Sequence, residues 1–168
     1  MKVLVTYFSE TGNTEKLAKA VYEGVGREDK TILPIDEVED PEPYDVVFCG
    51  FPVHSSTVPG KVQPFLKNFP EDKKLAIFST HGSLRGGQLA VTAFDYAGTL
   101  VKKARLLGIF GCRGKVKPSL IDALMHKAEH KAWAQEAQSS AARHPDDADL
   151  EDGKDFARKM MDKAHSGR

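Results

Sequence analysis

The chain has 168 residues, 40% of them hydrophobic, so it is long enough to bury a core as one domain. Its 24 Lys and Arg residues balance 24 Asp and Glu residues, so no net charge attracts nucleic acid or an acidic membrane. No apolar run approaches the ~20 residues of a membrane span and no signal peptide is recognisable, so we expect a cytoplasmic protein without nucleic-acid or membrane partners.

The first apolar run, residues 2–8, ends in a hydroxyl-rich loop, and a helical pattern begins directly after it. A strand, loop and helix in this order direct backbone N–H groups and hydroxyls to the helix N-terminus, where the helix dipole favours an anion. The pattern predicts a phosphate site without Lys or Arg, and the alternative is an ordinary turn capped by Thr14. The Gly-Lys-Ser/Thr ending of a P-loop is absent, and so is the Gly-x-Gly-x-x-Gly fingerprint of a dinucleotide site.

Four further near-continuous apolar runs predict strands at residues 30–35, 45–51, 74–80 and 105–112. Helical periodicity predicts helices at residues 14–27, 60–68 and 88–104. This alternation predicts an α/β fold, a three-layer α/β/α, doubly wound sheet of five parallel strands, with ligands bound at the carboxyl ends of the strands. Residues 36–44 are acidic and contain two prolines, so we expect a loop in place of the second helix.

After the fifth strand, residues 118–146 predict a helical insertion that precedes a C-terminal helix at 149–164. We expect one helix over residues 119–143, opened by a capping box of Ser119 and Asp122. Trp133 in this helix fits either a contact with a partner protein or a contact that holds the helix against the rest of the domain. Residues 1–168 are expected to form a single domain.

Residues 9–15 match the phosphate loop of flavodoxins position by position, and the chain resembles that family. The resemblance implies a flavodoxin-like sheet in the strand order 2-1-3-4-5 and non-covalent binding of FMN. It also implies that the phosphate is bound by the side chains of Ser9, Thr11, Asn13 and Thr14 and by the backbone N–H groups of Glu10 and Gly12.

Two later loops would border the flavin ring if the resemblance holds. The loop after the third strand would contact the ring through Pro52, Val53, His54 and Ser55. His54 stands where many relatives have Trp, and a surface histidine is the alternative. The loop after the fourth strand would contact the pyrimidine edge through Thr80, His81, Gly82, Ser83 and Gly87. Many relatives also have a Tyr here, but none occurs between Phe78 and Phe94, which argues against a very low-potential donor.

The remaining candidate residues are assigned no chemistry. Cys49 and Cys112 end apolar runs and are interpreted as buried, reduced thiols. Arg113 and Lys115 follow the fifth strand and are interpreted as a solvated loop, the alternative being that they reach the rim of the same site. His126, His130, His144 and His165 are interpreted as surface residues. No metal-ligand spacing and no catalytic residue is identified.

The resemblance implies an electron carrier that exchanges electrons with redox partner proteins, a reductase and an acceptor. Two alternatives remain open. One is an FMN-dependent NAD(P)H/quinone-type oxidoreductase, and the other is an accessory electron-donating subunit that docks through residues 119–143.

Overall fold

The computed structural model describes residues 1–83 and 87–167. Within them lies one sheet in the order β2–β1–β3–β4–β5, in which every neighbouring pair is parallel. This confirms the predicted doubly wound, five-stranded fold and its strand order. The strands are β1 (Lys2–Tyr7), β2 (Asp29–Pro34), β3 (Val46–Pro52), β4 (Lys74–His81) and β5 (Arg105–Arg113).

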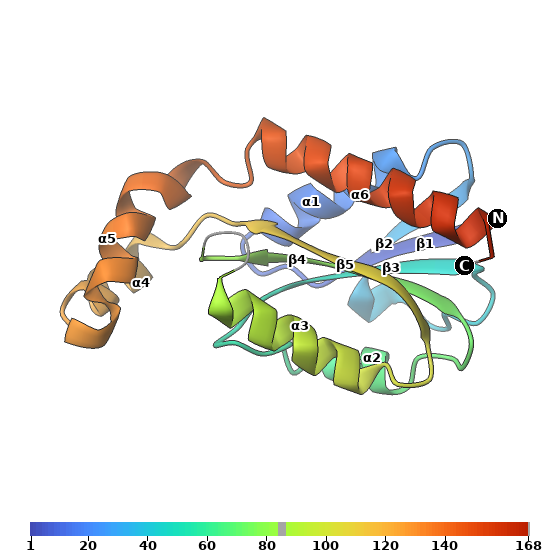
Figure 1. The fold of residues 1–168 in the computed structure, drawn as a ribbon, viewed down its shortest axis with the longest axis horizontal. Helices are drawn as coiled ribbons and strands as arrows, with labels where there is room; N and C mark the ends of the chain where they lie inside the picture. The colour runs from blue at the N-terminus through green and yellow to red at the C-terminus, as the bar shows by residue number, and fades with distance from the viewer. Residues whose placement is uncertain (84–86, 168) are drawn as a thin grey trace.

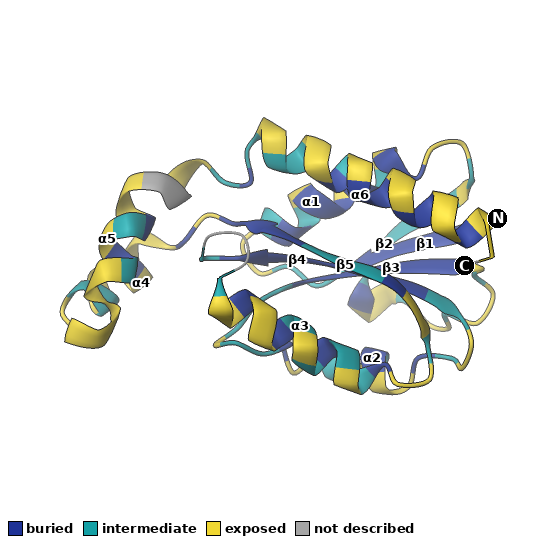
Figure 2. Ribbon diagram, in the orientation of Figure 1, coloured by how far each residue is buried: buried dark blue, intermediate teal, exposed yellow. Residues whose placement is uncertain are grey.

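Helices cover both faces of the sheet (Figure 1). On one face lie α1 (Asn13–Gly24) and α6 (Asp147–His165), and on the other lie α2 (Gln63–Lys67) and α3 (Gln88–Leu100). Side chains of a strand alternate between faces, so Phe48 packs on the first side and Val47 on the second. Figure 2 shows that the strands in the middle of the sheet are mostly buried, and their buried residues are mainly apolar. Burial on both faces explains why the strands form continuous apolar runs in the sequence.

The connection between β2 and β3 contains no α-helix, as predicted. It forms a short 3-10 turn, η1 (Ile35–Glu37), and then runs as a loop to β3. Ile35 is buried in the same apolar cluster as α2, and Val38 and Tyr44 pack against that cluster. Apolar side chains of the loop therefore cover sheet surface that a helix would otherwise cover.

The segment between β5 and α6 corrects the prediction of one helix over residues 119–143. It contains α4 (Pro118–Met125), η2 (Ala128–His130), α5 (Lys131–Ser140) and η3 (Ala141–Arg143). The chain becomes extended at Lys127, with φ −100° and ψ 116°. This break lets α4 and α5 fold onto each other and bury Ile121 with Ala134 and Ala137, which one straight helix would hold about 20 Å apart.

The helix ends also differ from the prediction. The N-cap residue of α4 is Lys117, whose side chain makes no capping bond, so the expected Ser119 capping box is wrong. Pro118 occupies the first turn, where its missing N–H is harmless. Instead, a capping box lies at α6, where Asp146 and Asp149 cap each other's backbone N–H groups, and that helix begins at Asp147.

Figure 1 shows α4 and α5 beyond the carboxyl ends of the strands, the end where α1 begins. The strand-end loops, the start of α1 and the α4–α5 pair thus meet at one edge of the sheet. None of the helices within residues 1–83 and 87–167 has the length and hydropathy that a membrane crossing requires.

Candidate functional site

A cavity of about 750 Å³ lies at this edge of the sheet. That volume lies in the range of sites for organic ligands of drug size. Six segments line it: the loop before α1 with the first turn of that helix, the loops after β3 and β4, the start of α3, the strand exit after β5, and the α4–α5 pair. The cavity therefore joins three predicted loops with three parts of the chain that sequence reasoning did not assign to the site.

The N-terminus of α1 forms the polar end of the cavity. Gly12 is the N-cap residue of α1, with φ +86°, a left-handed conformation that favours glycine. No side-chain hydrogen bond caps this end of the helix. Its N–H donates to Ser9 Oγ at 3.1 Å, which shapes the loop. Asn13 Nδ2 donates to Thr11 Oγ1 at 3.2 Å and to the Lys115 carbonyl at 3.0 Å. Hydroxyls and first-turn N–H groups thus gather at the positive end of a helix dipole.

The loop after β3 makes a strained two-residue turn beside the cavity. His54 and Thr57 exchange backbone hydrogen bonds of 3.1 and 2.8 Å, and between them Ser55 and Ser56 have φ +46° and +64°. Positive φ at both central residues is the pattern of a type I′ turn, which favours Asn and Gly. His54 is partly exposed, and its Nε2 lies 3.6 Å from Glu10 Oε2.

The loop after β4 contains a buried histidine at the cavity wall. His81 Nδ1 lies 2.8 Å from the Ser83 carbonyl oxygen. Because a carbonyl can only accept, Nδ1 carries the proton in this contact. The His81 carbonyl accepts from Gly114 N at 2.8 Å, and the Thr80 carbonyl accepts from Val53 N at 2.8 Å. These bonds hold the exits of β3, β4 and β5 in a fixed relation.

Comparison with known proteins identifies the family. A family model described as a flavodoxin domain matches residues 4–158. The chain belongs to the flavodoxin family. It is 31% identical over 175 residues to the flavodoxin-like domain-containing protein BilS of Clostridioides difficile, and the match covers 98% of each chain.

Solved flavodoxin structures have the same fold. Two-electron-reduced flavodoxin of Megasphaera elsdenii is 19% identical with a TM-score of 0.64, covering 95% of this chain and 98% of its own. Oxidised flavodoxin 2 of Bacillus cereus is 20% identical with a TM-score of 0.64, covering 97% and 99%. A flavoprotein of Lactobacillus acidophilus in complex with FMN is 17% identical with a TM-score of 0.54, covering 66% and 92%.

In this flavodoxin most predicted site residues line one cavity. Ser9, Gly12 and Gly87 do not line it: the first two shape the loop before α1, and Gly87 is the N-cap residue of α3. Residues 84–86 of the predicted loop lie outside the described residues. The predicted residues that line the cavity are Glu10, Thr11, Asn13, Thr14, Pro52, Val53, His54, Ser55, Thr80, His81, Gly82 and Ser83.

Sequence reasoning missed the wall that comes from the helical segments of this flavodoxin. Leu89 of α3, Leu120 and Leu124 of α4, His130 of η2 and Trp133 of α5 line the cavity. The expectation that His130 has only a surface role is therefore incomplete, since this exposed residue also faces the cavity. Helical periodicity identified apolar positions in this part of the chain, but it does not say where a segment that packs mainly on itself comes to lie.

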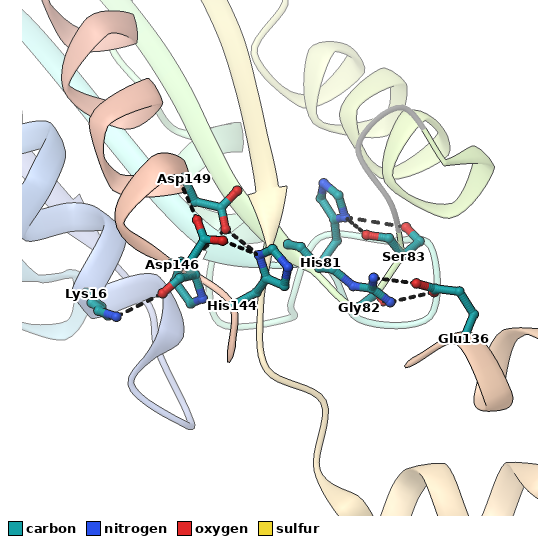
Figure 3. Close-up of polar contacts among 10 residues, drawn as sticks. Lys16, His81, Gly82, Ser83, Glu136, His144, Asp146 and Asp149 are labelled. Atoms are coloured by element: carbon teal, nitrogen blue, oxygen red, sulfur yellow. Dashed lines mark hydrogen bonds and ion pairs between the residues drawn. The ribbon is translucent and has the colours of Figure 1, made fainter. Parts of the chain in front are cut away.

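Arg113 also corrects its prediction. It was expected in a solvated loop, but its side chain is only 4% exposed and makes a two-point ion pair with Glu136 of α5. Figure 3 marks the two contacts at the labelled Glu136 carboxylate with dashed lines. Lys115 is exposed as expected, and it lines the cavity. Cys49 and Cys112 are buried, as predicted, and burial raises the pKa of the Cys49 thiol.

Proposed function

We propose that this flavodoxin binds FMN non-covalently in the cavity and carries electrons between redox partner proteins. The observation that carries the proposal is the hydroxyl-rich loop at the start of α1, which opens into a cavity of suitable size. The family match and the FMN complex of a structural neighbour support the choice of cofactor. When bound, FMN would supply the redox chemistry through its isoalloxazine ring.

The residues of the cavity suit the two ends of FMN. The hydroxyls of Thr11 and Thr14, the side-chain amide of Asn13 and the first-turn N–H groups of α1 would bind the phosphate, with charge-assisted hydrogen bonds of about 1.5–3 kcal/mol each. The loops that contain His54 and His81 lie across the carboxyl ends of β3 and β4 and would border the ring. The helix dipole makes a Lys or Arg at the phosphate unnecessary.

The lining residues favour a carrier over a hydrolytic or covalent enzyme. Among the described residues that line the cavity there is no cysteine and only one carboxylate, Glu10. Acid–base catalysis by paired carboxylates or covalent catalysis by a thiolate would need other side chains. Binding and orientation of a cofactor need the hydroxyls, glycines and backbone groups that are present.

The test is a comparison of FMN with riboflavin, which lacks the phosphate. Dissociation constants are measured by quenching of flavin fluorescence for the wild type and for the double variant Thr11→Ala, Asn13→Ala. The wild type should prefer FMN strongly. Loss of two charge-assisted hydrogen bonds should weaken FMN binding by at least about 100-fold and leave riboflavin binding nearly unchanged.

A matched control carries the same substitutions on exposed positions away from the cavity, Asn68→Ala and Thr99→Ala. It should bind both flavins as the wild type does. Equal affinities of the wild type for FMN and riboflavin would contradict the phosphate assignment, and absence of any flavin binding would overturn the proposed function.

One observation favours the oxidoreductase alternative. Leu89 and Leu120 are 49% and 48% exposed, and both line the cavity. Exposed apolar side chains at a cavity mouth are typical of a site for an apolar ligand. Sustained NAD(P)H consumption with a quinone, by the FMN-loaded protein alone, would favour an enzyme, whereas reduction only in the presence of a reductase would favour a carrier.

A further inference from the structure

The α4–α5 pair contributes an aromatic side chain to the cavity that the core of the fold lacks. Trp133, in the first turn of α5, lines the cavity. Its indole lies against Gly82 in the loop after β4: a Cβ atom at Gly82 would be 3.1 Å from Trp133 Cζ2 and 3.0 Å from Val116 Cγ2. Glycine at position 82 thus gives the indole room to reach the wall of the site.

The ion pair of Arg113 and Glu136 holds α5 in this place. Arg113 Nη1 donates to Glu136 Oε1 at 2.6 Å and Nη2 to Oε2 at 2.5 Å, and Nη2 also donates to the Gly82 carbonyl at 3.3 Å. Figure 3 shows Glu136 pointing from α5 toward the loop at Gly82. Because positions 133 and 136 are one helical turn apart, a two-point contact at Glu136 also orients Trp133.

The indole N–H of Trp133 is a buried donor that faces no acceptor among the described residues. Its Nε1 atom is inaccessible to solvent, and no described residue accepts its hydrogen bond. A buried polar group without a partner costs about 1–3 kcal/mol, so most such groups in proteins have one. The Nε1 and Cζ2 edge of the indole therefore lies against the protein at Gly82, and the rest of the ring is left to line the cavity.

We propose that Trp133 is the aromatic wall of the flavin site, with the face of its indole against the isoalloxazine. The inference rests on the proposed binding of FMN. The loop after β4 has no Tyr between Phe78 and Phe94, so the aromatic group comes from a segment some 50 residues further along the chain. Glu136 is the positioning residue, since it acts through Trp133.

A direct test uses the wild-type protein. The chain has one tryptophan, so a ¹H–¹⁵N spectrum contains one indole N–H resonance. Saturation with FMN should shift that resonance and slow its exchange with water. Riboflavin should do the same, and inorganic phosphate should not. An indole resonance that stays in place in the FMN-saturated protein would overturn the proposal while leaving the proposed function intact.

Variants give a second, independent measure. Trp133→Ala should weaken FMN binding by about 10- to 100-fold, and Trp133→Phe, which keeps an aromatic face of smaller area, by about fivefold to tenfold. The control is Gln138→Ala on the exposed side of α5, which should bind FMN within about twofold of the wild type. Wild-type affinity in Trp133→Ala would contradict the proposal, and failure of the wild type to bind FMN would remove the proposed function as well.

A double-mutant cycle tests the role of Glu136. Glu136→Gln should lower FMN affinity in the wild-type background and have no further effect in Trp133→Ala, because its effect passes through the indole. Equal losses in both backgrounds would assign Glu136 a general structural role instead.

Discussion

The hydroxyl of Thr14, in the first turn of α1, lies 2.9 Å from the hydroxyl of Thr80 at the end of β4. Both side chains are buried, although the residues are 66 positions apart. This hydrogen bond ties the loop that would bind the phosphate to the loop that would border the ring. It gives the two halves of the site a fixed relation before any ligand enters.

Thr80→Val removes this hydrogen bond and keeps the shape of the side chain. The Thr14 hydroxyl then stays buried with one partner fewer, and the free energy of unfolding should fall by about 1–3 kcal/mol. Urea denaturation measures the loss. Thr31→Val, at a half-buried hydroxyl of β2, is the matched control and should stay within about 0.5 kcal/mol. Equal stability of both variants would mean that the Thr14–Thr80 bond adds nothing to the fold.

Gly50 in β3 is fixed by close contact with an aromatic ring. A Cβ atom at this position would lie 2.1 Å from Phe78 Cε2, and Phe78 is fully buried in the neighbouring strand. Gly50→Ala should therefore lower the free energy of unfolding by at least about 1–3 kcal/mol through overpacking. Gly60→Ala is the control, since nothing lies within 4 Å of a Cβ atom there. Thermal unfolding measures the loss. If the unfolding midpoint of Gly60→Ala shifted as much as that of Gly50→Ala, overpacking against Phe78 would not be the cause.

The sheet could be predicted because its sequence pattern has one physical cause. Strands such as β3 are buried on both faces, so their residues are apolar without a break, and the connecting helices show a 3.6-residue period. The position of the site followed from the same reasoning, because loops after parallel strands meet at one edge. The structure was needed for the boundaries, as at α2, which spans Gln63–Lys67 within the predicted helix at residues 60–68.

The wall formed by α4 and α5 could not be predicted, for reasons that lie in its contacts. Ile121, Ala134 and Ala137 pack on each other, so their periodicity predicts helices but no direction of docking. The burial of Arg113 depends on Glu136, which is 23 residues away, and a charged residue after a strand otherwise indicates a solvated loop. Trp133 was noted in the sequence, but its position beside Gly82 depends on these two contacts.

The turn at Ser55 and Ser56 stores backbone strain that glycine would relieve. A left-handed conformation costs a non-glycine residue about 1–2 kcal/mol, and part of this gain is offset by the greater freedom of glycine in the unfolded chain. Ser56→Gly should therefore raise the free energy of unfolding by about 0.5–1 kcal/mol in urea denaturation. Ser166→Gly, at the end of α6 with φ −73°, should not raise it. A loss of stability in Ser56→Gly would mean that the Ser56 side chain makes a compensating contact.

The start of α6 depends on the ionised form of Asp146. Its side chain accepts a hydrogen bond of 3.0 Å from Asp149 N, and Asp149 Oδ2 accepts from Asp146 N at 3.0 Å and lies 2.6 Å from His144 Nδ1. The backbone N–H of Asp149, and after it the charge of His144, hold the pKa of Asp146 below its ordinary value of 3.8. Because folding lowers the pKa of Asp146, its ionised carboxylate stabilises the fold at pH values above the pKa that it has in the unfolded chain. This stabilisation is lost as the pH falls through the lower, folded value.

Asp146→Ala should therefore lower the free energy of unfolding at pH 7 and at pH 5, where the carboxylate is ionised. Its difference from the wild type should shrink as the pH falls below 3.8, because the wild type then loses the same interaction. Denaturation curves at pH 7, 5 and 3 measure this difference. Asp146→Asn keeps the capping acceptor without the charge, so it should be less harmful at pH 7, and Asp147→Ala removes an exposed neighbour outside the capping box and should have the smallest effect. A penalty for Asp146→Ala that is the same at pH 3 as at pH 7 would show that the cap acts through its shape alone and that its charge contributes nothing.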